Sequence, residues 1–183
     1  MSEKKVSEAI EYRRSVRIFD KEKEIDVAIV KKCIEHATLA PNSSNLQLWE
    51  FYHITSNEEI KKIAKACFNQ PAAKPAKQFV IPVVRKDLWK RRIASNVAFI
   101  ESEFEKSDSK DKKKTKGAIS YYQKILPKIY GVGNFKGWIN HFSTFFKGLN
   151  KVVYRQVKKS DMRVVVHKST ALAAQNFLVS MAG

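Results

Sequence analysis

The N-terminal part of the chain repeats apolar residues at the three- and four-residue spacing of amphipathic helices. A first short helix, ending near Arg14, is predicted from positions that share one face: Val6, Ala9, Ile10 and Arg13. A second helix is predicted to begin after Asp26, a residue type that commonly caps helix N-termini, and to stop at Pro41. Its apolar face consists of Val27, Val30, Ile34 and Ala37.

Two runs rich in β-branched and aromatic residues predict strands, at residues 48–54 and 79–84. The second run is expected to be a central strand, with Pro82 at an end or a bulge. Between the two runs, residues 56–59 have the spacing of a capping box, and a helical apolar face follows: Ile60, Ile63, Ala64 and Cys67. Cys67 is therefore expected to be a buried, inert thiol.

The second half of the chain is predicted to be mainly helical. A helix of several turns is indicated by Ile93, Val97, Ile100 and Phe104. Residues 117–160 contain many aromatic residues, but Pro127 and several glycines interrupt the pattern, so helical pieces and loops are expected there. The last helix, at 161–181, is apolar nearly all round in its later half and is expected to be buried. This order of elements favours an α+β fold in which helices cover a sheet.

The composition is typical of a globular chain in a reducing compartment. The 183 residues are 44% hydrophobic, and two cysteines are too few for a disulfide framework. No apolar run is long enough to span a bilayer, and the N-terminus lacks a secretory signal pattern. We therefore expect a cytoplasmic protein with no membrane partner.

The net charge of +17 is regional. Residues 105–168 carry 16 basic and 4 acidic side chains, whereas residues 1–104 carry 19 and 14. The densest part, 106–116, has no apolar periodicity, which favours a solvated loop or helix end over a nucleic-acid patch. A basic nucleic-acid-binding protein is still an alternative, although no zinc-finger, helix-turn-helix or similar signature accompanies the charge.

The sharpest local motif is the run Arg13-Arg14-Ser15-Val16-Arg17, which lies where the first helix gives way to an extended segment. Alternation along that segment brings Arg13, Ser15 and Arg17 to one side. Guanidinium groups match phosphate oxygens in pairs, and a hydroxyl adds a further donor, so the motif suits a phosphomonoester. The alternative is an exposed basic corner paired with Asp20 or Glu24.

Two further segments are rich in amide side chains. The loop Pro41-Asn42-Ser43-Ser44-Asn45-Leu46-Gln47 precedes the first strand, and Asn69-Gln70 follows the third helix. Amides both donate and accept hydrogen bonds, so they can bind the edge of a heterocycle without adding charge. Taken alone, each segment is also an ordinary polar loop.

Together these features resemble the nitroreductase family of flavin enzymes. Four segments carry the resemblance, and their order and spacing recur over nearly the whole chain: residues 13–17, 40–51, 68–70 and 167–177. The family's loop usually has proline where Leu48 stands here.

The resemblance implies a nitroreductase-like fold with a central, mostly antiparallel sheet, and a homodimer that binds FMN at the subunit interface. NADH or NADPH would reduce the flavin, which would then reduce a nitroaromatic or quinone-type acceptor in a second step. Trp138 to Phe146 is a candidate lid over the acceptor, or ordinary core. The resemblance implies no catalytic residue and no metal, and His36, His53, His141 and His167 are assigned no role.

The resemblance also implies which residues hold the cofactor. Arg13, Ser15 and Arg17, with Arg14 nearby, would bind the phosphate and ribityl chain. The loop that precedes the first strand would lie along the isoalloxazine from the other subunit, through Pro41, Asn42, Ser43, Asn45 and Gln47. Asn69 would bind the pyrimidine edge, with Gln70 next to it. A lysine often follows in the family, but Ala72 stands there and Lys74 is close by.

The family pattern continues past Gly183, so we expect residues 1–183 to be a single, C-terminally incomplete domain with a basic insertion around 105–160. Within the family, a flavin-fragmenting or reductively dehalogenating activity is an alternative to nitroreduction.

Overall fold

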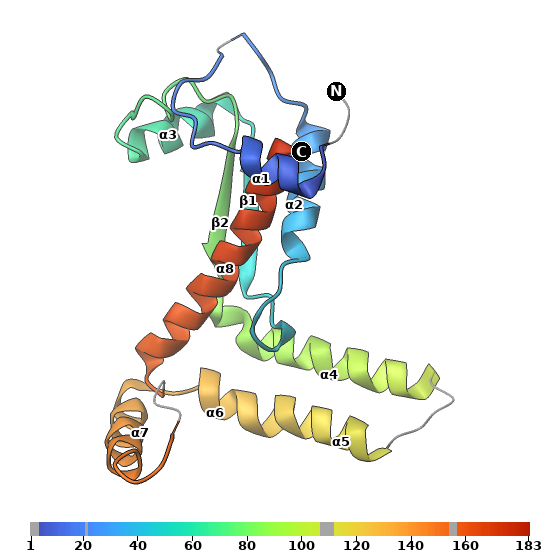
Figure 1. Cartoon of the computed structure of the whole chain (residues 1–183), viewed down its shortest axis with the longest axis vertical. Helices are drawn as coiled ribbons and strands as arrows, with labels where there is room; N and C mark the ends of the chain where they lie inside the picture. Colours follow the sequence, from blue (N-terminus) through green and yellow to red (C-terminus); the bar gives the residue numbers. More distant parts are fainter. Residues whose placement is uncertain (1–3, 21, 107–111, 154–156) are drawn as a thin grey trace. The chain divides into compact units, whose positions relative to one another are not determined.

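The computed structural model describes residues 4–20, 22–106, 112–153 and 157–183 (Figure 1). The chain forms two compact units. Unit 1 consists of residues 1–41, 49–83 and 170–183, and unit 2 consists of residues 42–48 and 84–169.

The first two helices of unit 1 lie where the sequence predicts them. Helix α1 spans Val6–Tyr12 and α2 spans Val27–Thr38. The Asp26 side chain accepts a hydrogen bond of 2.8 Å from the backbone N–H of Ala28, which confirms the predicted cap. In α1 only Ala9 is buried, so Val6 and Ile10 of its predicted apolar face are exposed.

Helix α3 (Asn57–Ala66) differs from its prediction at both ends. Ser56 occupies the N-cap position, but its side chain makes no capping hydrogen bond. Glu58 and Glu59 instead pair with Lys62, at 2.7 and 3.0 Å, so the predicted capping box is wrong. Cys67 is the C-cap residue, just past the end of the helix, and it is only half-buried, so the expectation of a buried thiol is wrong.

Strands β1 (Trp49–Ile54) and β2 (Phe79–Val84) form a two-stranded sheet in the described part of the chain. The backbone N–H of Arg85 donates to the carbonyl of Leu48 at 2.9 Å, which joins the end of β2 to the start of β1 and makes the pair antiparallel. Since β2 has a strand on one side only, the expectation of a central strand is not met there. The core of unit 1 beside β1 contains Ala40, Trp49 and Ala173, with Phe51 packed against them.

Unit 2 has its own core, built mainly by helices. Helix α4 spans Trp89–Lys106, α5 spans Lys112–Ser120, and α6 spans Leu126–Tyr130 after a π-helical turn at Tyr121–Ile125. Short 3-10 turns lie at Ser43–Asn45 and Lys86–Leu88. The buried cluster consists of Leu46, Leu48, Ile93, Val97, Leu126, Tyr130 and Val166. Of the lysine-rich run at 106–116, residues 107–111 lie outside the described residues, and the lysines that begin α5 are exposed.

Two further helices complete the chain, α7 (Asn134–Lys147) and α8 (Lys159–Ala182). In its later half α8 is tied to other parts of unit 1: Ser180 Oγ lies 2.8 Å from His36 Nδ1, and Lys4 Nζ donates to the carbonyl of Ala182 at 2.9 Å. Ala173 is fully buried, but Leu172 and Leu178 are nearly half exposed, so the prediction that this half is buried all round is wrong. Among the described residues, unit 1 covers one side of the helix.

No helix in the described part of the chain combines the length and the apolar character that a membrane crossing requires.

The Asp26 cap provides a direct test of how α2 is held. Asp26→Ala should lower the free energy of unfolding by about 1 kcal/mol, because it leaves a helix N–H without its partner. Urea denaturation measures the change, and Glu24→Ala, an exposed acidic position two residues earlier, is the matched control. Equal losses in the two variants would contradict the capping role.

Candidate functional site

The segment Arg13–Arg17, called the basic segment here, begins where α1 ends. The backbone of Arg13 is already extended, with φ −57° and ψ 127°. Arg14 Nη1 donates to the carbonyl of Glu11 and, at 3.0 Å, to the carbonyl of Arg13. Since the last carbonyls of a helix lack partners within it, Arg14 serves as a cap for α1.

The other two arginines of the basic segment differ from Arg14. Within the described ranges, neither Arg13 nor Arg17 forms a side-chain hydrogen bond or ion pair, and Arg17 and Ser15 are exposed. The alternative pairing with Asp20 or Glu24 is not formed among the described residues, and Asp20 Oδ1 instead accepts the backbone N–H of Glu22 at 3.0 Å. The basic segment therefore offers two guanidinium groups and a hydroxyl to an external anion.

The loop at 42–48, called the amide loop here, belongs to unit 2 and is held by its own side chains. Asn42 Oδ1 accepts the backbone N–H of Gln47 at 2.8 Å, and Gln47 Nε2 donates to Asn45 Oδ1 at 3.2 Å. These bonds bring together three of the predicted flavin contacts. Ser43 and Asn45 are exposed, as is Pro41, which precedes the loop and belongs to unit 1.

Helix α4 and the π-helical turn hold the amide loop from the side. Asn96 Nδ2 donates to the carbonyl of Asn45 at 2.9 Å, and the Tyr122 hydroxyl donates to the carbonyl of Ser44 at 2.9 Å. The side chain of Ser44 lies 2.7 Å from the Tyr121 hydroxyl. Burial, and secondarily Tyr121, raises the pKa of Tyr122, so its phenol stays protonated and remains a donor at neutral pH.

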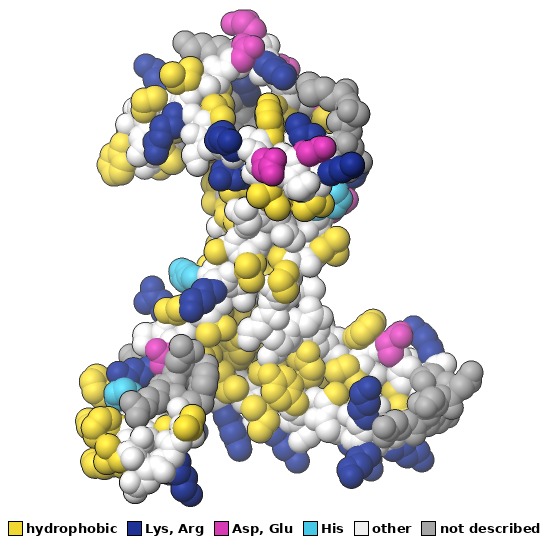
Figure 2. All heavy atoms as spheres, in the orientation of Figure 1, with side chains coloured by type: hydrophobic (Ala, Val, Ile, Leu, Met, Phe, Trp, Pro, Cys, Tyr) yellow, Lys and Arg dark blue, Asp and Glu magenta, His cyan; other side chains and the backbone are white. Residues whose placement is uncertain are grey.

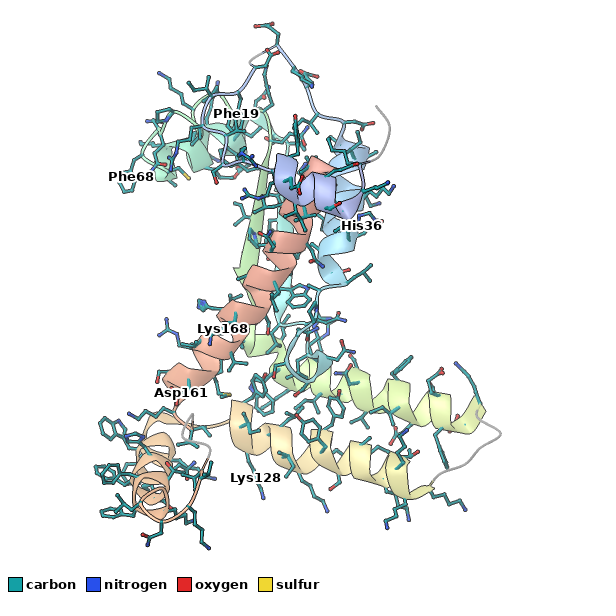
Figure 3. All side chains as sticks on the ribbon, in the orientation of Figure 1. Phe19, His36, Phe68, Lys128, Asp161 and Lys168 are labelled. Carbon is teal, nitrogen blue, oxygen red and sulfur yellow. The ribbon has the colours of Figure 1, made fainter. Side chains whose placement is uncertain are left out.

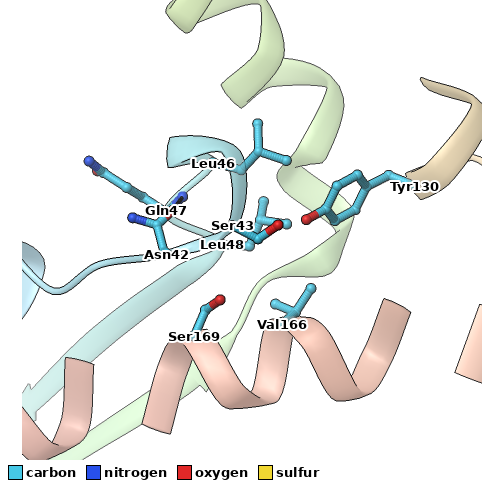
Figure 4. A pocket seen from close by; sticks show the side chains of 8 residues that line it. All are labelled: Asn42, Ser43, Leu46, Gln47, Leu48, Tyr130, Val166 and Ser169. Atoms are coloured by element: carbon cyan, nitrogen blue, oxygen red, sulfur yellow. Dashed lines mark hydrogen bonds between the residues drawn. The ribbon is translucent and has the colours of Figure 1, made fainter. Parts of the chain in front are cut away.

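A small cavity lies beneath the amide loop (Figure 4). Its volume is about 10 Å³, at the lower limit for one water molecule. The figure shows Leu46, Leu48 and the Tyr130 ring on one side, with Val166 and Ser169 of α8 on the other. A flavin ring does not fit in this cavity, so a planar ligand would have to use the exposed side of the loop.

The loop after α3 carries the third group of predicted contacts. The backbone N–H of Asn69 donates to the carbonyl of Ala64 at 2.9 Å, which closes the end of the helix. The side chains of Asn69 and Gln70 are both exposed. Phe68, which Figure 3 labels, is 88% exposed, although it is among the most apolar residue types.

Lys74, the nearest lysine to the family's usual position, is exposed and lines an open hollow of about 520 Å³ within unit 1. The other lining residues are Glu22, Pro71, Pro75 and Lys77. Ala72, at the position where the family has lysine, is half-buried.

The amide loop and the loop after α3 share an uncommon backbone conformation. Among the described residues, every non-glycine residue with positive φ lies in one of these two loops: Ser44, Asn45, Gln47, Phe68 and Asn69, with φ between 46° and 57°. Each such residue costs of order 1–3 kcal/mol, and strain of this kind concentrates at ligand-binding sites. Three of the five, Asn45, Gln47 and Asn69, are predicted flavin contacts.

The predicted contacts thus fall into three groups. The basic segment and the loop after α3 belong to unit 1, and the amide loop belongs to unit 2. In the described part of unit 1, no hydrogen bond joins the basic segment to Asn69 or Gln70. Asn96 and Tyr122 were not identified from the sequence, since nothing in their helical spacing indicates that they bind a loop some fifty to eighty positions earlier.

No group of three or more His, Cys, Asp or Glu side chains in the described ranges is arranged to hold a metal ion. Three of the four histidines have structural partners among the described residues: His36 contacts Ser180, His53 Nε2 lies 2.7 Å from Gln78 Oε1, and the His141 ring contacts Trp138 and Phe142.

Comparison with known proteins identifies the family. Residues 10–183 match the sequence model of the nitroreductase family. No curated protein sequence matches the chain.

Solved structures are similar in fold at low sequence identity. One, described as a nitroreductase in complex with FMN from Exiguobacterium sibiricum, has a TM-score of 0.59 at 20% identity, covering 100% of this chain and 72% of that one. A second, described as a nitroreductase from Bacillus subtilis, has a TM-score of 0.64 at 15% identity, covering 96% and 69%. A third, described as an NAD(P)H:FMN oxidoreductase from Staphylococcus epidermidis, has a TM-score of 0.60 at 18% identity, covering 96% and 67%.

The anchoring of the amide loop can be tested with a double-mutant cycle. Asn96→Ala and Tyr122→Phe should each lower the free energy of unfolding by about 1 kcal/mol. Asn96 Nδ2 also lies 3.5 Å from the carbonyl of Ser44, which accepts from Tyr122. The double variant should therefore lose more than the sum, because removing both side chains leaves this carbonyl without either donor. Urea denaturation gives these energies, and hydrogen exchange at the Gln47 amide reports the loosening of the loop.

Tyr52→Phe is the matched control, because its hydroxyl bonds Glu50 on an exposed strand position instead of the loop. The anchoring role of Tyr122 would be contradicted if hydrogen exchange at the Gln47 amide became faster in this control, or if it did not become faster in Tyr122→Phe.

Proposed function

Because the chain belongs to the nitroreductase family, we propose that it is an FMN-dependent oxidoreductase that uses NADH or NADPH to reduce nitroaromatic or quinone-type acceptors. The flavin oxidoreductase class follows from the family and from the FMN complex of its Exiguobacterium neighbour. NAD(P)H as the reductant is suggested by the description of the Staphylococcus neighbour.

Two features carry the proposal: arginine side chains without a partner, and two amide-bearing loops with left-handed backbone residues. Arg13 and Arg17 have no partner in the described ranges, and all left-handed non-glycine residues there lie in the two amide-bearing loops. Uncommitted guanidinium groups beside a serine suit a phosphomonoester, and fixed amides suit the edge of a heterocycle. The residues present therefore fit FMN.

The roles of these residues follow from their chemistry. Arg13, Ser15 and Arg17 would hold the phosphate and ribityl chain, with Arg14 fixing the segment to α1. Asn42, Ser43, Asn45 and Gln47, after Pro41, would lie along the flavin ring. Asn69 and Gln70 would bind its pyrimidine edge.

The chemistry that FMN supplies when bound is hydride transfer from NAD(P)H to an acceptor, in two successive half-reactions. The protein's own contribution is to bind and orient the cofactor. The amides of the two loops carry no charge, so they can orient the ring without imposing a fixed charge on it. No side chain is assigned as nucleophile or general base.

We also propose that the working enzyme is a homodimer in which the amide loop of one subunit faces the cofactor held by the other. The cavity beneath the loop holds at most about one water, so the ligand needs a second wall on the loop's exposed side. A partner subunit supplies that wall.

Arg17 distinguishes a phosphate site from an exposed basic corner. Arg17→Ala should weaken FMN binding ten- to a hundredfold and leave riboflavin binding nearly unchanged, because charge-assisted bonds of roughly 1.5–3 kcal/mol are lost only with the phosphate. Arg17→Lys keeps the charge but not the planar fork, so an intermediate loss is expected. Quenching of flavin fluorescence measures both affinities.

Arg14→Ala is the matched control, since Arg14 is engaged at the end of α1 and should leave the ratio of FMN to riboflavin affinity unchanged. If Arg17→Ala lowered the affinities for FMN and riboflavin equally, the basic segment would not be the phosphate site.

The reaction itself has a kinetic signature. The protein of natural length, loaded with FMN, should oxidise NADH or NADPH with a nitroaromatic or quinone acceptor and give parallel double-reciprocal lines, because both substrates use one site in turn. Steady-state absorbance measurements of nicotinamide oxidation test this. Intersecting lines would contradict the shared site, and a purified protein that takes up no flavin would contradict the proposed function as a whole.

A further inference from the structure

Helix α7 exposes the side that a helix normally buries. Large apolar side chains lie at positions spaced three and four apart, which places them on one face. Phe135 is 81% and Phe146 64% exposed. This apolar face consists of Phe135, Trp138, Ile139, Phe142, Phe145 and Phe146 on α7, and of Leu149 in the turn after it. Figure 2 shows hydrophobic side chains gathered over this helix, and in Figure 3 ring side chains project from it.

The opposite side of α7 carries small and polar residues, and this is the side that packs. A Cβ atom on Gly137 would come within 3.2 Å of Val132 Cγ1 and 3.4 Å of Lys158 Cα, so the helix approaches a neighbouring backbone at this glycine. Thr144, half-buried, bonds the carbonyls of Asn140 and His141. Since α7 is attached through this side, the exposure of its apolar face is built into the packing of unit 2.

The charges on and next to α7 are mostly positive, with Asp161, whose Oδ2 accepts the backbone N–H of Lys158 at 2.8 Å, as an acidic neighbour. From residue 112 to residue 160 the sequence contains no Asp or Glu. On α7 and the turn after it, Lys136, Lys147 and Lys151 are exposed. Lys158 Nζ lies 5.1 Å from the centre of the Trp138 ring, which places a cation beside the largest aromatic of the face.

We propose that α7 binds the surface of an anionic membrane, with the apolar face in the boundary between headgroups and acyl chains. A helix with aromatic residues on one face and lysines beside it has the chemistry of an interfacial helix, which lies in the membrane plane without crossing it. At 14 residues α7 is about 21 Å long and cannot span a bilayer. Lysines near the surface attract anionic lipids, and their long stems let the charge remain among the headgroups.

The charges favour a membrane over a second copy of the chain. In a two-fold symmetric interface the same patch meets itself, so the lysines beside one apolar face would approach those of the other, with no acidic residue from 112 to 160 to pair with them. An anionic lipid surface complements the lysines and the apolar face together.

The expectation of no membrane partner was drawn from the lack of a spanning segment. An interfacial helix is a different case, because its signal is one apolar face and not a long apolar run. The membrane proposal does not depend on the proposed enzymatic function, since none of the proposed flavin contacts lies on α7.

Vesicle binding by the protein of natural length tests the proposal. The protein should co-sediment with vesicles of phosphatidylcholine and phosphatidylglycerol, and more weakly with phosphatidylcholine alone. Phe142→Ser should lower the partition coefficient about tenfold, because one ring no longer enters the interface. Replacing Lys136, Lys147 and Lys151 by Gln should cost about fivefold per lysine on the anionic vesicles only.

Phe99→Ser is the matched control: Phe99 is also an exposed phenylalanine on a helix of unit 2, with the same 64% exposure as Phe146. It should not change the partition coefficient. Fluorescence gives a second readout, since Trp138 emission should shift to the blue on binding, and Trp138→Phe should still bind while losing most of that shift.

Failure of the protein to bind anionic vesicles would overturn the proposal, as would equal losses in Phe142→Ser and Phe99→Ser. If Phe142→Ser combined with Phe146→Ser converts a dimer to monomers in light scattering, the apolar face belongs to a second copy and the membrane proposal is wrong.

Discussion

A backbone held in the left-handed region without glycine is the constraint on which the candidate site depends. Ser44 and Asn45 occupy that region in the amide loop, although each pays a steric cost that glycine would avoid. The cost is offset by hydrogen bonds from Asn96 and Tyr122 to the loop's carbonyls. Because these donors come from a long helix and the turn after α5, the core of unit 2 fixes the conformation of the loop.

The basic segment shows how far the sequence alone could go. Three arginines around a serine predict an anion site from residue types alone, and that assignment stays a prediction. Which arginine is engaged could not be predicted, because it depends on where α1 ends: the helix stops at Tyr12, and Arg14 then reaches back to its carbonyls.

Local signals predicted most helices and both strands, and the errors have two sources: competing bonds within one helix, and tertiary contacts. Asp26 caps its helix as its type suggests, but Ser56 does not, since Glu58 and Glu59 both pair with Lys62 and none of these bonds is encoded by the capping pattern. Leu172 and Leu178 were expected to be buried because the end of α8 is apolar all round. Composition shows that such a helix needs cover, but it cannot show what provides it.

Helix α7 packs through its polar side and exposes its apolar face, which has a consequence for how the free protein responds to temperature. The attraction between apolar surfaces in water strengthens on warming from the cold and weakens on cooling. Helix α7 exposes several aromatic rings, so the hydrophobic attraction that this surface exerts depends on temperature. The attraction of this face to the apolar boundary of a membrane therefore strengthens on warming from the cold, while the lysines beside it still oppose contact between two copies of the chain.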